Sequence, residues 1–322
     1  MNGGLYMYYI GVDLGGTNIA AAIVTEEGKI IRRSSVPTLR GREYPEILKD
    51  MADLCLRLME EEGLEEKDIH SIGIGSPGSV DPENGILVYA NNLKFDNVPM
   101  RAEMQKYISV PVYIENDANS AALGESISGA AKKYGDSVTV TLGTGVGGGV
   151  IVNGKILTGS FHAGAELGHH VIDMNGDKCS CGRHGCWEVY ASATALIRDA
   201  STAATQNPDS LLFTMVEGNV ERMNAKIPFD AAQQGDSVAS QVLEQYIRYL
   251  AVGIVNIINI FEPEAIVIGG GVSAQKENLI TPLEEEVKRH IYGGVLKTKL
   301  LTSNLGNDAG IIGAAMLSKI YG

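Results

Sequence analysis

Short hydrophobic runs separated by glycine-rich or polar turns dominate the first part of the chain. Residues 8–12, 19–24 and 29–34 are rich in β-branched residues, which predicts three strands. The segment Asp13-Leu-Gly-Gly-Thr17 joins the first two strands, and Glu27-Gly28 is a hairpin turn between the second and third. The pattern therefore predicts a three-stranded unit with a glycine loop near its start.

The same pattern returns about 130 residues later. Residues 137–142 predict a strand, Gly143–Gly149 a glycine turn, residues 150–152 and 155–157 two further strands, and Asn153-Gly154 a type I′ turn between them. A repeat of this spacing indicates a duplicated domain rather than a short solenoid repeat. Two α/β halves, each with a glycine turn facing a shared cleft, are typical of the actin-like (ribonuclease H-like) ATPase fold.

Other segments have helical or buried-strand patterns. Apolar residues at helical spacing predict helices over residues 45–62, 118–131, 192–204, 236–261 and 310–320. Continuous apolar runs predict strands over residues 69–75, 110–114 and 265–268. Cys55 falls within the pattern of the first helix and is expected in the core.

Composition narrows the possible partners of the chain. The net charge of −13 over 322 residues argues against a nucleic-acid or anionic-membrane partner. A bound nucleotide would then rely on backbone N–H groups, helix ends and Mg²⁺. No signal peptide is visible, no apolar run is long enough for a bilayer, and four unpaired cysteines fit a reducing cytoplasm. Met7 is an alternative start.

Three of the four cysteines lie close together, as Cys179-Ser-Cys181 followed by Cys186, and His169 lies a short loop upstream. Three thiolates and one imidazole complete a tetrahedral zinc shell closed to water, which is typical of a structural site. A disulfide fits poorly, because three cysteines cannot pair evenly and Cys179 and Cys181 are too close in sequence to be bridged without strain. Reduced, unliganded thiols are the alternative to zinc, and His170 is an alternative ligand to His169.

Glu166 and Glu188 lie at the two ends of this segment. A metal bound to His169 and Cys186 would also fix the direction of the two carboxylates, which could then read vicinal hydroxyls. For either glutamate alone, an ordinary surface position is the simpler interpretation.

The segment Glu166-Leu-Gly-His169, followed by Cys179-Ser-Cys-Gly-Arg-His-Gly-Cys-Trp-Glu188, resembles the signature of the ROK family of sugar kinases and sugar-responsive repressors. The continuation from Trp187 to Leu196 resembles most the bacterial glucokinases of that family. The resemblance covers nearly the whole chain and favours His169 over His170 as the metal ligand. It implies the actin-like fold, with a small domain of residues 1–118 plus 302–322 and a large domain of residues 119–301 that carries the zinc loop.

Three glycine-rich turns are candidates for an ATP site. Glycine lets the backbone approach a ligand, and successive N–H groups in such a turn form an anion-binding concavity. The loop after residue 142 is not a dinucleotide fingerprint, because a strand follows it. A turn without a ligand explains Gly269-Gly-Gly271 nearly as well. The loops resemble the ATP-binding loops of ROK kinases, and the implied residues are Asp13, which would hold Mg²⁺ through water, Gly15, Gly16, Thr17, Asn18, Gly143, Thr144, Gly145, Gly270 and Gly271.

Asn116-Asp117 ends a predicted strand and opens a predicted helix. Asp117 could simply be the N-cap of that helix. The pair also resembles the ROK position at which an aspartate accepts the proton of the sugar hydroxyl, which makes Asp117 the implied catalytic base. The implied substrate-binding residues are Asn92, Asn116, Asp117, Glu166, His169, Glu188 and Gly78 of the Ser76-Pro-Gly turn.

The resemblance therefore implies ATP-dependent phosphorylation of D-glucose to glucose 6-phosphate, with Mg²⁺ accompanying ATP and Zn²⁺ as a structural ion. N-acetylmannosamine, N-acetylglucosamine, mannose or fructose remain open as alternative hexoses. A sugar-sensing repressor is less favoured, because it would need a helix-turn-helix ahead of the first glycine loop and only a dozen residues precede Asp13. A non-enzymatic actin-like ATPase has no use for the cysteine loop. Family analogy suggests a cytoplasmic homodimer or homotetramer.

Overall fold

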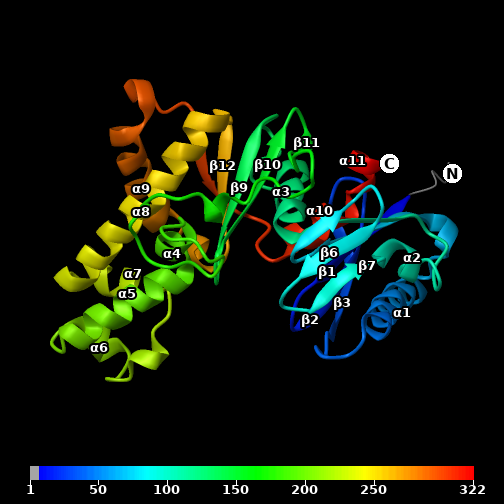
Figure 1. Ribbon diagram of the computed structural model, residues 1–322, viewed down its shortest axis with the longest axis horizontal. Helices are drawn as coiled ribbons and strands as arrows, with labels where there is room; N and C mark the ends of the chain where they lie inside the picture. Colours follow the sequence, from blue (N-terminus) through cyan, green and yellow to red (C-terminus); the bar gives the residue numbers. More distant parts are fainter. Residues whose placement is uncertain (1–6) are drawn as a thin grey trace. The chain divides into compact units, whose positions relative to one another are not determined.

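The computed structural model describes residues 7–322 (Figure 1), so residues 1–6, which precede the alternative start at Met7, lie outside the described part. Packing divides the chain into two compact units. Unit 1 comprises residues up to 139 together with residues 149–165 and 304–322, and unit 2 comprises residues 140–148 and 166–303. The domain boundaries near Asn119 and Leu301 stay a prediction.

Two five-stranded sheets have the same internal order. The first has the order β3 (Ile30–Pro37), β2 (Asn18–Val24), β1 (Tyr8–Leu14), β4 (Ile69–Ser76) and β8 (Val112–Asn116). The second has the order β11 (Lys155–Ile156), β10 (Val146–Val152), β9 (Ser137–Leu142), β12 (Ala265–Gly269) and β13 (Lys299–Thr302). In both sheets the hairpin strands pair antiparallel and the outer pair is parallel. The common order confirms the duplication that the sequence predicts.

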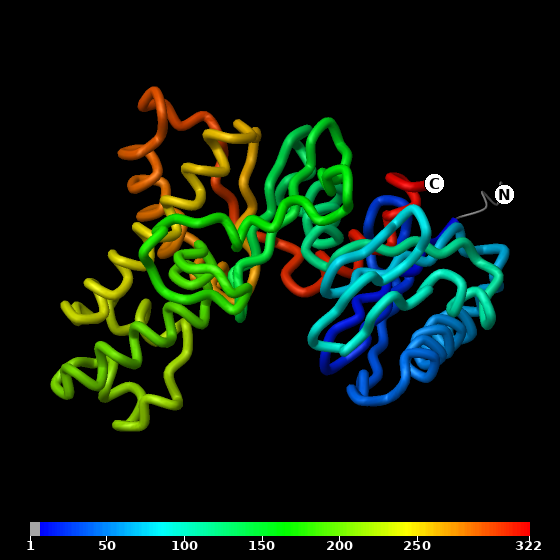
Figure 2. Tube along the Cα trace, viewed as in Figure 1, coloured from blue at the N-terminus to red at the C-terminus, as the bar shows by residue number. Residues whose placement is uncertain are grey.

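The first sheet buries both of its faces, as the alternation of side chains along β1 requires. Ile10, Val12 and Leu14 pack against α1 (Tyr44–Glu62) in a large core that also includes residues of α2 (Met100–Met104). Tyr9 lies on the opposite face, in a second cluster formed with residues of α3 (Asp117–Ile127) and α10 (Asp308–Ala315). Figures 1 and 2 agree that α10, drawn in red, lies beside the blue strand β1.

The local sequence explains why α1 forms and where it stops. Pro45 occupies its first turn, where the missing N–H costs nothing, and Gly63 ends it with a left-handed φ of 66°. Its buried stripe consists of Ile47, Leu48, Met51, Ala52, Leu54, Cys55, Leu58 and Met59. Cys55 is fully buried, as expected, and burial raises its pKa to about 12, so this thiol stays protonated and inert.

Unit 2 is mostly helical. Its helices are α4 (Glu188–Ala191), α5 (Ala193–Gln206), α6 (Leu211–Met215), α7 (Ile227–Gln233), α8 (Ser237–Phe261) and α9 (Glu277–His290). Asp236 caps α8 by accepting a 2.7 Å hydrogen bond from the N–H of Ala239, and Glu262 ends the helix with a φ of 44°. Among residues 7–322, no helix combines the length and apolar character that crossing a bilayer requires.

Several elements lie outside the sequence-based expectations. A third sheet is formed by β5 (Ser79–Asp81), β6 (Ile86–Ala90) and β7 (Phe95–Val98). Short 3₁₀ turns occur at η1 (Glu66–Asp68), η2 (Leu167–His169), η3 (Val220–Arg222), η4 (Gly271–Gln275) and η5 (Tyr292–Gly294). The predicted helix over residues 118–131 ends at Ile127, and the predicted helix over residues 310–320 is two helices, α10 and α11 (Ser318–Tyr321).

The predicted glycine turn over residues 143–149 is wrong in its extent. Only residues 143–145 form the turn, and Gly147, Gly148 and Gly149 belong to β10. A Cβ atom on Gly149 would lie 2.6 Å from Cβ of Ala122, and one on Gly148 would lie 2.5 Å from a methyl carbon of Leu167. These two glycines therefore allow close packing within the protein, so they are not evidence for a phosphate nearby.

Backbone contacts between α10 and its neighbours are the tightest in unit 1. A Cβ atom on Gly73 would lie 1.7 Å from the carbonyl oxygen of Ala314, and one on Gly313 would lie 1.6 Å from that of Ser120. Gly11 and Gly124 face α10 in the same way. Only glycine lets the helix approach the strands and α3 this closely.

Gly313→Ala is expected to lower the free energy of unfolding by about 1–3 kcal/mol or more, because the new methyl group must displace backbone. Gly310→Ala in the same helix is the matched control, since its Cβ would meet only the Asp13 Cγ at 4.0 Å. That control should be neutral or more stable by up to ~1 kcal/mol through helix propensity. Urea unfolding followed by circular dichroism measures both variants, and equal stabilities would contradict the packing argument.

Candidate functional site

The carboxyl ends of three parallel strands meet at one edge of the first sheet. Asp13 of β1 pairs with Gly75 of β4, and Ser76 of β4 pairs with Asn116 of β8. Ligands of open α/β sheets bind beyond the carboxyl ends of the strands. The sheet therefore places Asp13, the Ser76–Gly78 turn and Asp117 where a ligand of unit 1 would bind.

Asn116, and not Asp117, is the N-cap of α3. Its Oδ1 accepts hydrogen bonds from the N–H groups of Ala118 (2.8 Å) and Asn119 (3.2 Å), and its Nδ2 donates to the carbonyl of Gly78 (3.0 Å). The alternative in which Asp117 merely caps the helix is therefore wrong. Because Asn116 supplies the cap, Asp117 occupies the first helical position. Its Oδ1 accepts a 2.8 Å hydrogen bond from the N–H of Ala118, and its Oδ2 takes no part in that bond.

The pKa values of Asp13 and Asp117 are both raised. Desolvation, followed by the negative charge of Asp117, raises the pKa of Asp13 to about 6. Desolvation also raises the pKa of Asp117, although the hydrogen bond from Ala118 opposes the shift. Paired carboxyl groups with raised pKa values are typical of functional sites, because no structural need keeps two like charges together.

Glu115 supports this edge from behind, and the sequence did not indicate it. Its carboxylate is buried, and Oε1 accepts hydrogen bonds from the N–H of Asn116 (2.7 Å) and from Nδ2 of Asn119 (3.1 Å). The hydroxyl of Tyr321 donates to Oε2. The last helix of the chain therefore contacts the residue that precedes Asn116-Asp117, a link over 206 positions that no local pattern could reveal.

The first glycine loop, residues 13–18, is closed on itself and fastened to the segment after β3. The N–H of Gly15 donates to the carbonyl of Asn18 (3.0 Å). Thr38, which is fully buried, donates from Oγ1 to the carbonyl of Gly15 (2.7 Å) and from its N–H to that of Thr17 (2.8 Å). Thr17 and Asn18 are exposed. Asn92 lies near the loop, since its Nδ2 would be 3.5 Å from a Cβ on Gly16.

In unit 2, His169, Cys179, Cys181 and Cys186 form one cluster, whose candidate ligand atoms all lie within 4.8 Å of one another. The sulfurs of Cys181 and Cys186 are 3.6 Å apart, and the sulfur of Cys179 is 3.7 Å from Nδ1 of His169. A Zn–S bond of about 2.3 Å in tetrahedral geometry separates two sulfurs by about 3.8 Å. The cluster therefore has the dimensions of a zinc shell, whereas a disulfide needs a separation of about 2.05 Å.

Tight turns hold the ligands in place. Gly182 adopts a φ of 89°, and Gly185 adopts a φ of 71°, where a Cβ would lie 1.5 Å from the carbonyl oxygen of Asp173. Arg183 donates to the carbonyl of His169. Trp187, next to the last cysteine, is fully buried and donates from Nε1 to the carbonyl of Tyr249 on α8 (2.9 Å), which anchors the loop to the helical part of unit 2.

His170 does not join the cluster. Its Nδ1 hydrogen-bonds the carbonyl of Leu167, and its ring packs on Trp187 with centroids 5.1 Å apart. Burial lowers its pKa, which favours the neutral imidazole. Of the two candidate histidines, only His169 is therefore positioned as a metal ligand.

Glu188 connects the cysteine cluster to the second glycine loop, residues 143–145. Its Oε2 accepts a 3.0 Å hydrogen bond from the N–H of Val146, and its Oε1 lies 3.8 Å from the sulfur of Cys179. A Cβ on Gly145 would lie 2.0 Å from Oε2, so a larger residue there would displace the Glu188 carboxylate. Glu166 is exposed at the start of η2, and its side chain caps no helix N–H.

The third glycine turn, residues 269–271, lies against the second loop. Gly270 adopts a φ of 80°, and a Cβ there would lie 2.3 Å from the carbonyl oxygen of Leu142. Gly143, by contrast, has open space where a Cβ would be, as has Gly271, while Thr144 is exposed. Unit 2 thus brings two of the three predicted nucleotide loops together beside Glu188.

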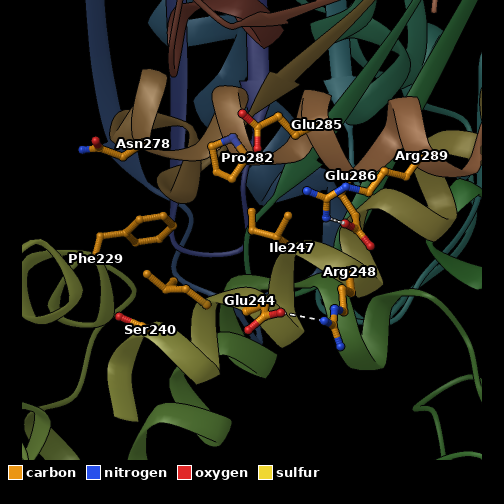
Figure 3. Close-up of a pocket in the computed structure, with 11 residues that line it drawn as sticks. Phe229, Ser240, Glu244, Ile247, Arg248, Asn278, Pro282, Glu285, Glu286 and Arg289 are labelled. Carbon is orange, nitrogen blue, oxygen red and sulfur yellow. Dashed lines mark hydrogen bonds and ion pairs between the residues drawn. The ribbon is translucent and has the colours of Figure 1, made fainter. Parts of the chain in front are cut away.

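Unit 2 also has a groove of about 310 Å³ between α8 and α9 (Figure 3). Its floor includes Ile247 and Pro282, and the ion pairs Arg248–Glu244 (2.6 Å) and Arg289–Glu286 (2.8 Å) flank it. None of the residues predicted for the active site lines this groove. It is therefore separate from the candidate chemistry.

A model of the ROK family matches residues 9–320 of the chain. The chain belongs to the ROK family. It is 40% identical to a glucokinase of Thermotoga maritima over 96% of both chains, and 31% identical to a xylose repressor of Caldicellulosiruptor bescii over 94% of this chain and 76% of the repressor. A solved ROK glucokinase from Streptomyces griseus, in complex with glucose and AMPPNP, superposes with a TM-score of 0.81 at 35% identity over 96% of this chain and 98% of that one. The predicted actin-like fold is therefore confirmed.

The variant Asp117→Asn of this ROK protein is expected to be more stable than the parent at pH 8 and equally stable near pH 4. The pKa of Asp13 rises from 3.8 in the unfolded chain to about 6 in the folded protein. Its protonated form therefore stabilises the folded state fully below pH 3.8, and this stabilisation is lost as the pH rises through about 6. Removing the Asp117 charge reduces this loss for Asp13 and abolishes it for position 117. We expect Tm at pH 8 to rise by about 2–4 °C, with no difference near pH 4. If the difference in Tm between variant and parent were smaller at pH 8 than at pH 4, the electrostatic assignment would be contradicted.

Cys181→Ala is expected to lose bound zinc, because three ligands hold the ion far less tightly than four. Elemental analysis of the purified variant measures this loss directly. Cys55→Ala is the matched control, since Cys55 is buried in α1 outside the cluster and its replacement should leave the zinc content unchanged. Full zinc content in Cys181→Ala would rule out the proposed ligand set.

Proposed function

We propose that this ROK protein is an ATP-dependent glucokinase, which converts ATP and D-glucose to ADP and glucose 6-phosphate. The observation that carries the proposal is the 40% identity to the Thermotoga maritima glucokinase along 96% of both chains. The raised pKa values of Asp13 and Asp117 at the carboxyl ends of parallel strands support it from the geometry.

Asp117 is the general base of the reaction. A sugar hydroxyl attacks the γ-phosphorus in line, the bond from phosphorus to the bridging oxygen of ADP breaks, and Asp117 receives the hydroxyl proton. Because the transition state of phosphoryl transfer is loose, orienting the hydroxyl is the larger part of this role. The raised pKa of Asp117 favours its acceptance of the proton.

The glycine loops and Asp13 bind the nucleotide. The backbone N–H groups of the first and second loops would hold the phosphates, Asp13 would hold Mg²⁺ through water, and Gly270 and Gly271 would approach the adenosine. Mg²⁺, when bound with ATP, neutralises charge on the β- and γ-phosphates. Asp13 must be ionised for this role, and its pKa of about 6 makes it so at neutral pH.

The sugar is bound by directed hydrogen bonds from Asn92, Glu166, His169, Glu188, the Gly78 turn and the Asn116-Asp117 pair. The three cysteines and His169 would hold Zn²⁺ as a structural ion, which would fix the sugar-binding edge of unit 2. The bond from Val146 to Glu188 supports this role, because it ties that edge to a phosphate loop. A site of this kind discriminates strongly against sugars that lack a hydroxyl, since its own polar groups would be left unpaired.

A hexose other than glucose, namely N-acetylmannosamine, N-acetylglucosamine, mannose or fructose, is the alternative within kinases. A sugar-sensing regulator is a second candidate function, favoured by the 31% identity to a xylose repressor. Cytoplasmic location fits the free cysteines, and assembly as a homodimer or homotetramer follows the family analogy.

A coupled ADP-release assay across a panel of hexoses tests the proposal. We expect the highest kcat/KM with glucose, and Asp117→Asn should lower kcat by on the order of 10²-fold or more while glucose binding is largely kept. Isothermal titration calorimetry measures the binding.

Asp209→Asn is the control for this substitution, since Asp209 is an exposed residue of unit 2 outside the proposed site, and it should leave kcat unchanged. Turnover of Asp117→Asn near that of the parent would remove the base assignment. No ADP release with any hexose would favour the regulatory function instead.

A further inference from the structure

Arg40 lies beside the first glycine loop. A Cβ atom placed on Gly16 would be 3.9 Å from both Cδ and Nη1 of Arg40, and 3.5 Å from Nδ2 of Asn92. An arginine guanidinium and an asparagine amide thus approach the same residue of a loop whose N–H groups suit phosphate. Nothing in the local sequence indicated a role for Arg40, and composition argued that the nucleotide would be bound without basic side chains.

The segment that carries Arg40 is held firmly on the loop. The two hydrogen bonds from Thr38, to the carbonyls of Gly15 and Thr17, fasten its start. Arg42 braces it by donating to the carbonyl of Thr38 (3.1 Å) and to Asp50 (2.7 Å). Leu39 adopts a φ of 50°, which is unfavourable for a leucine and persists only where the surroundings require it.

The charge of Arg40 is available to a ligand. Its neighbours Arg32, Arg33 and Arg42 each pair with a carboxylate, at Glu62, Asp308 and Asp50. Arg40 is exposed and, within residues 7–322, forms no ion pair with a carboxylate.

We propose that Arg40 contacts the phosphoryl group that is transferred. This inference rests on the proposed kinase function. Asn92 is expected to contact the sugar and Gly16 the triphosphate, so a group close to both lies where the sugar hydroxyl meets the terminal phosphate. Guanidinium suits this place, because its donors can engage two phosphoryl oxygens at once and its charge offsets the negative charge on them.

In this step Arg40 neither gains nor loses a proton. The bond between the γ-phosphorus and the oxygen of ADP breaks, the bond to the sugar oxygen forms, and the proton passes to Asp117. Arg40 stabilises the oxygens of the phosphoryl group while it moves between them, so its contribution is to kcat more than to substrate binding.

Arg40→Ala is expected to lower kcat by on the order of 10²-fold, while KM for glucose changes by about threefold or less. Arg40→Lys should recover only part of the loss, since it restores the charge without the forked donors. Guanidinium chloride at a few millimolar (~5 mM) should partly rescue Arg40→Ala but not the parent, a response that a merely structural role would not give. Arg57→Ala, which removes an exposed arginine on α1, is the matched control and should keep the parent kcat.

An unchanged kcat in Arg40→Ala, or a change confined to KM for ATP, would overturn the inference while leaving the kinase function intact. The same loss in Arg57→Ala would also overturn it, because the effect would then be one of general charge. If Arg40→Ala does not fold by circular dichroism, Arg40→Lys and Arg40→Gln decide the question by the same comparison of kcat. An inactive parent protein would instead contradict the proposed function itself.

Discussion

The contact between α10 and the first sheet is the constraint on which unit 1 depends. A Cβ on Gly73 would lie 1.7 Å from the carbonyl oxygen of Ala314, and the backbone of Gly313 meets that of Ser120 on α3 just as closely. This approach allows a helix from the end of the chain to lie directly on the glycines of β1 and β4. It also holds α3 against β4 and β8, and α3 begins with Asp117. The position of the proposed base therefore depends on packing among glycines of unit 1.

The corresponding feature of unit 2 is its cluster of candidate metal ligands, His169, Cys179, Cys181 and Cys186. The segment that carries Cys179, Cys181 and Cys186 has few hydrogen-bonded elements of its own, and its turns need left-handed glycines. An ion bound by these side chains would stabilise the loop, because each ligand bond would fix one part of it. Glu188 connects this cluster to the second glycine loop, because it accepts a hydrogen bond from the N–H of Val146. This hydrogen bond thus connects a residue proposed for sugar binding to a loop proposed for nucleotide binding.

The charged forms of two carboxyl groups in unit 1 lower the stability of the folded state, and both groups belong to the proposed active site. Desolvation disfavours the charged forms of Asp13 and Asp117, and the negative charge of Asp117 further disfavours that of Asp13. Carboxyl groups with raised pKa values are typical of functional sites. The buried Glu115, which three donors satisfy, and the unpaired Arg40 beside Gly16 complete this arrangement. An acidic chain can therefore offer a local site for a polyanion.

The sequence by itself determined the duplicated strand units, the glycine loops and the cysteine cluster, because each depends on spacing over a few neighbouring residues. It also placed Asp117 at the junction of a strand and a helix. Tertiary structure alone decided that Thr38 fastens the first loop, that Asn116 donates to the carbonyl of Gly78, and that Tyr321 reaches Glu115. These partners are distant along the chain and follow no periodic pattern. A glycine in the sequence likewise does not reveal whether a phosphate, a helix or a side chain lies opposite it, because that neighbour is brought there only by folding.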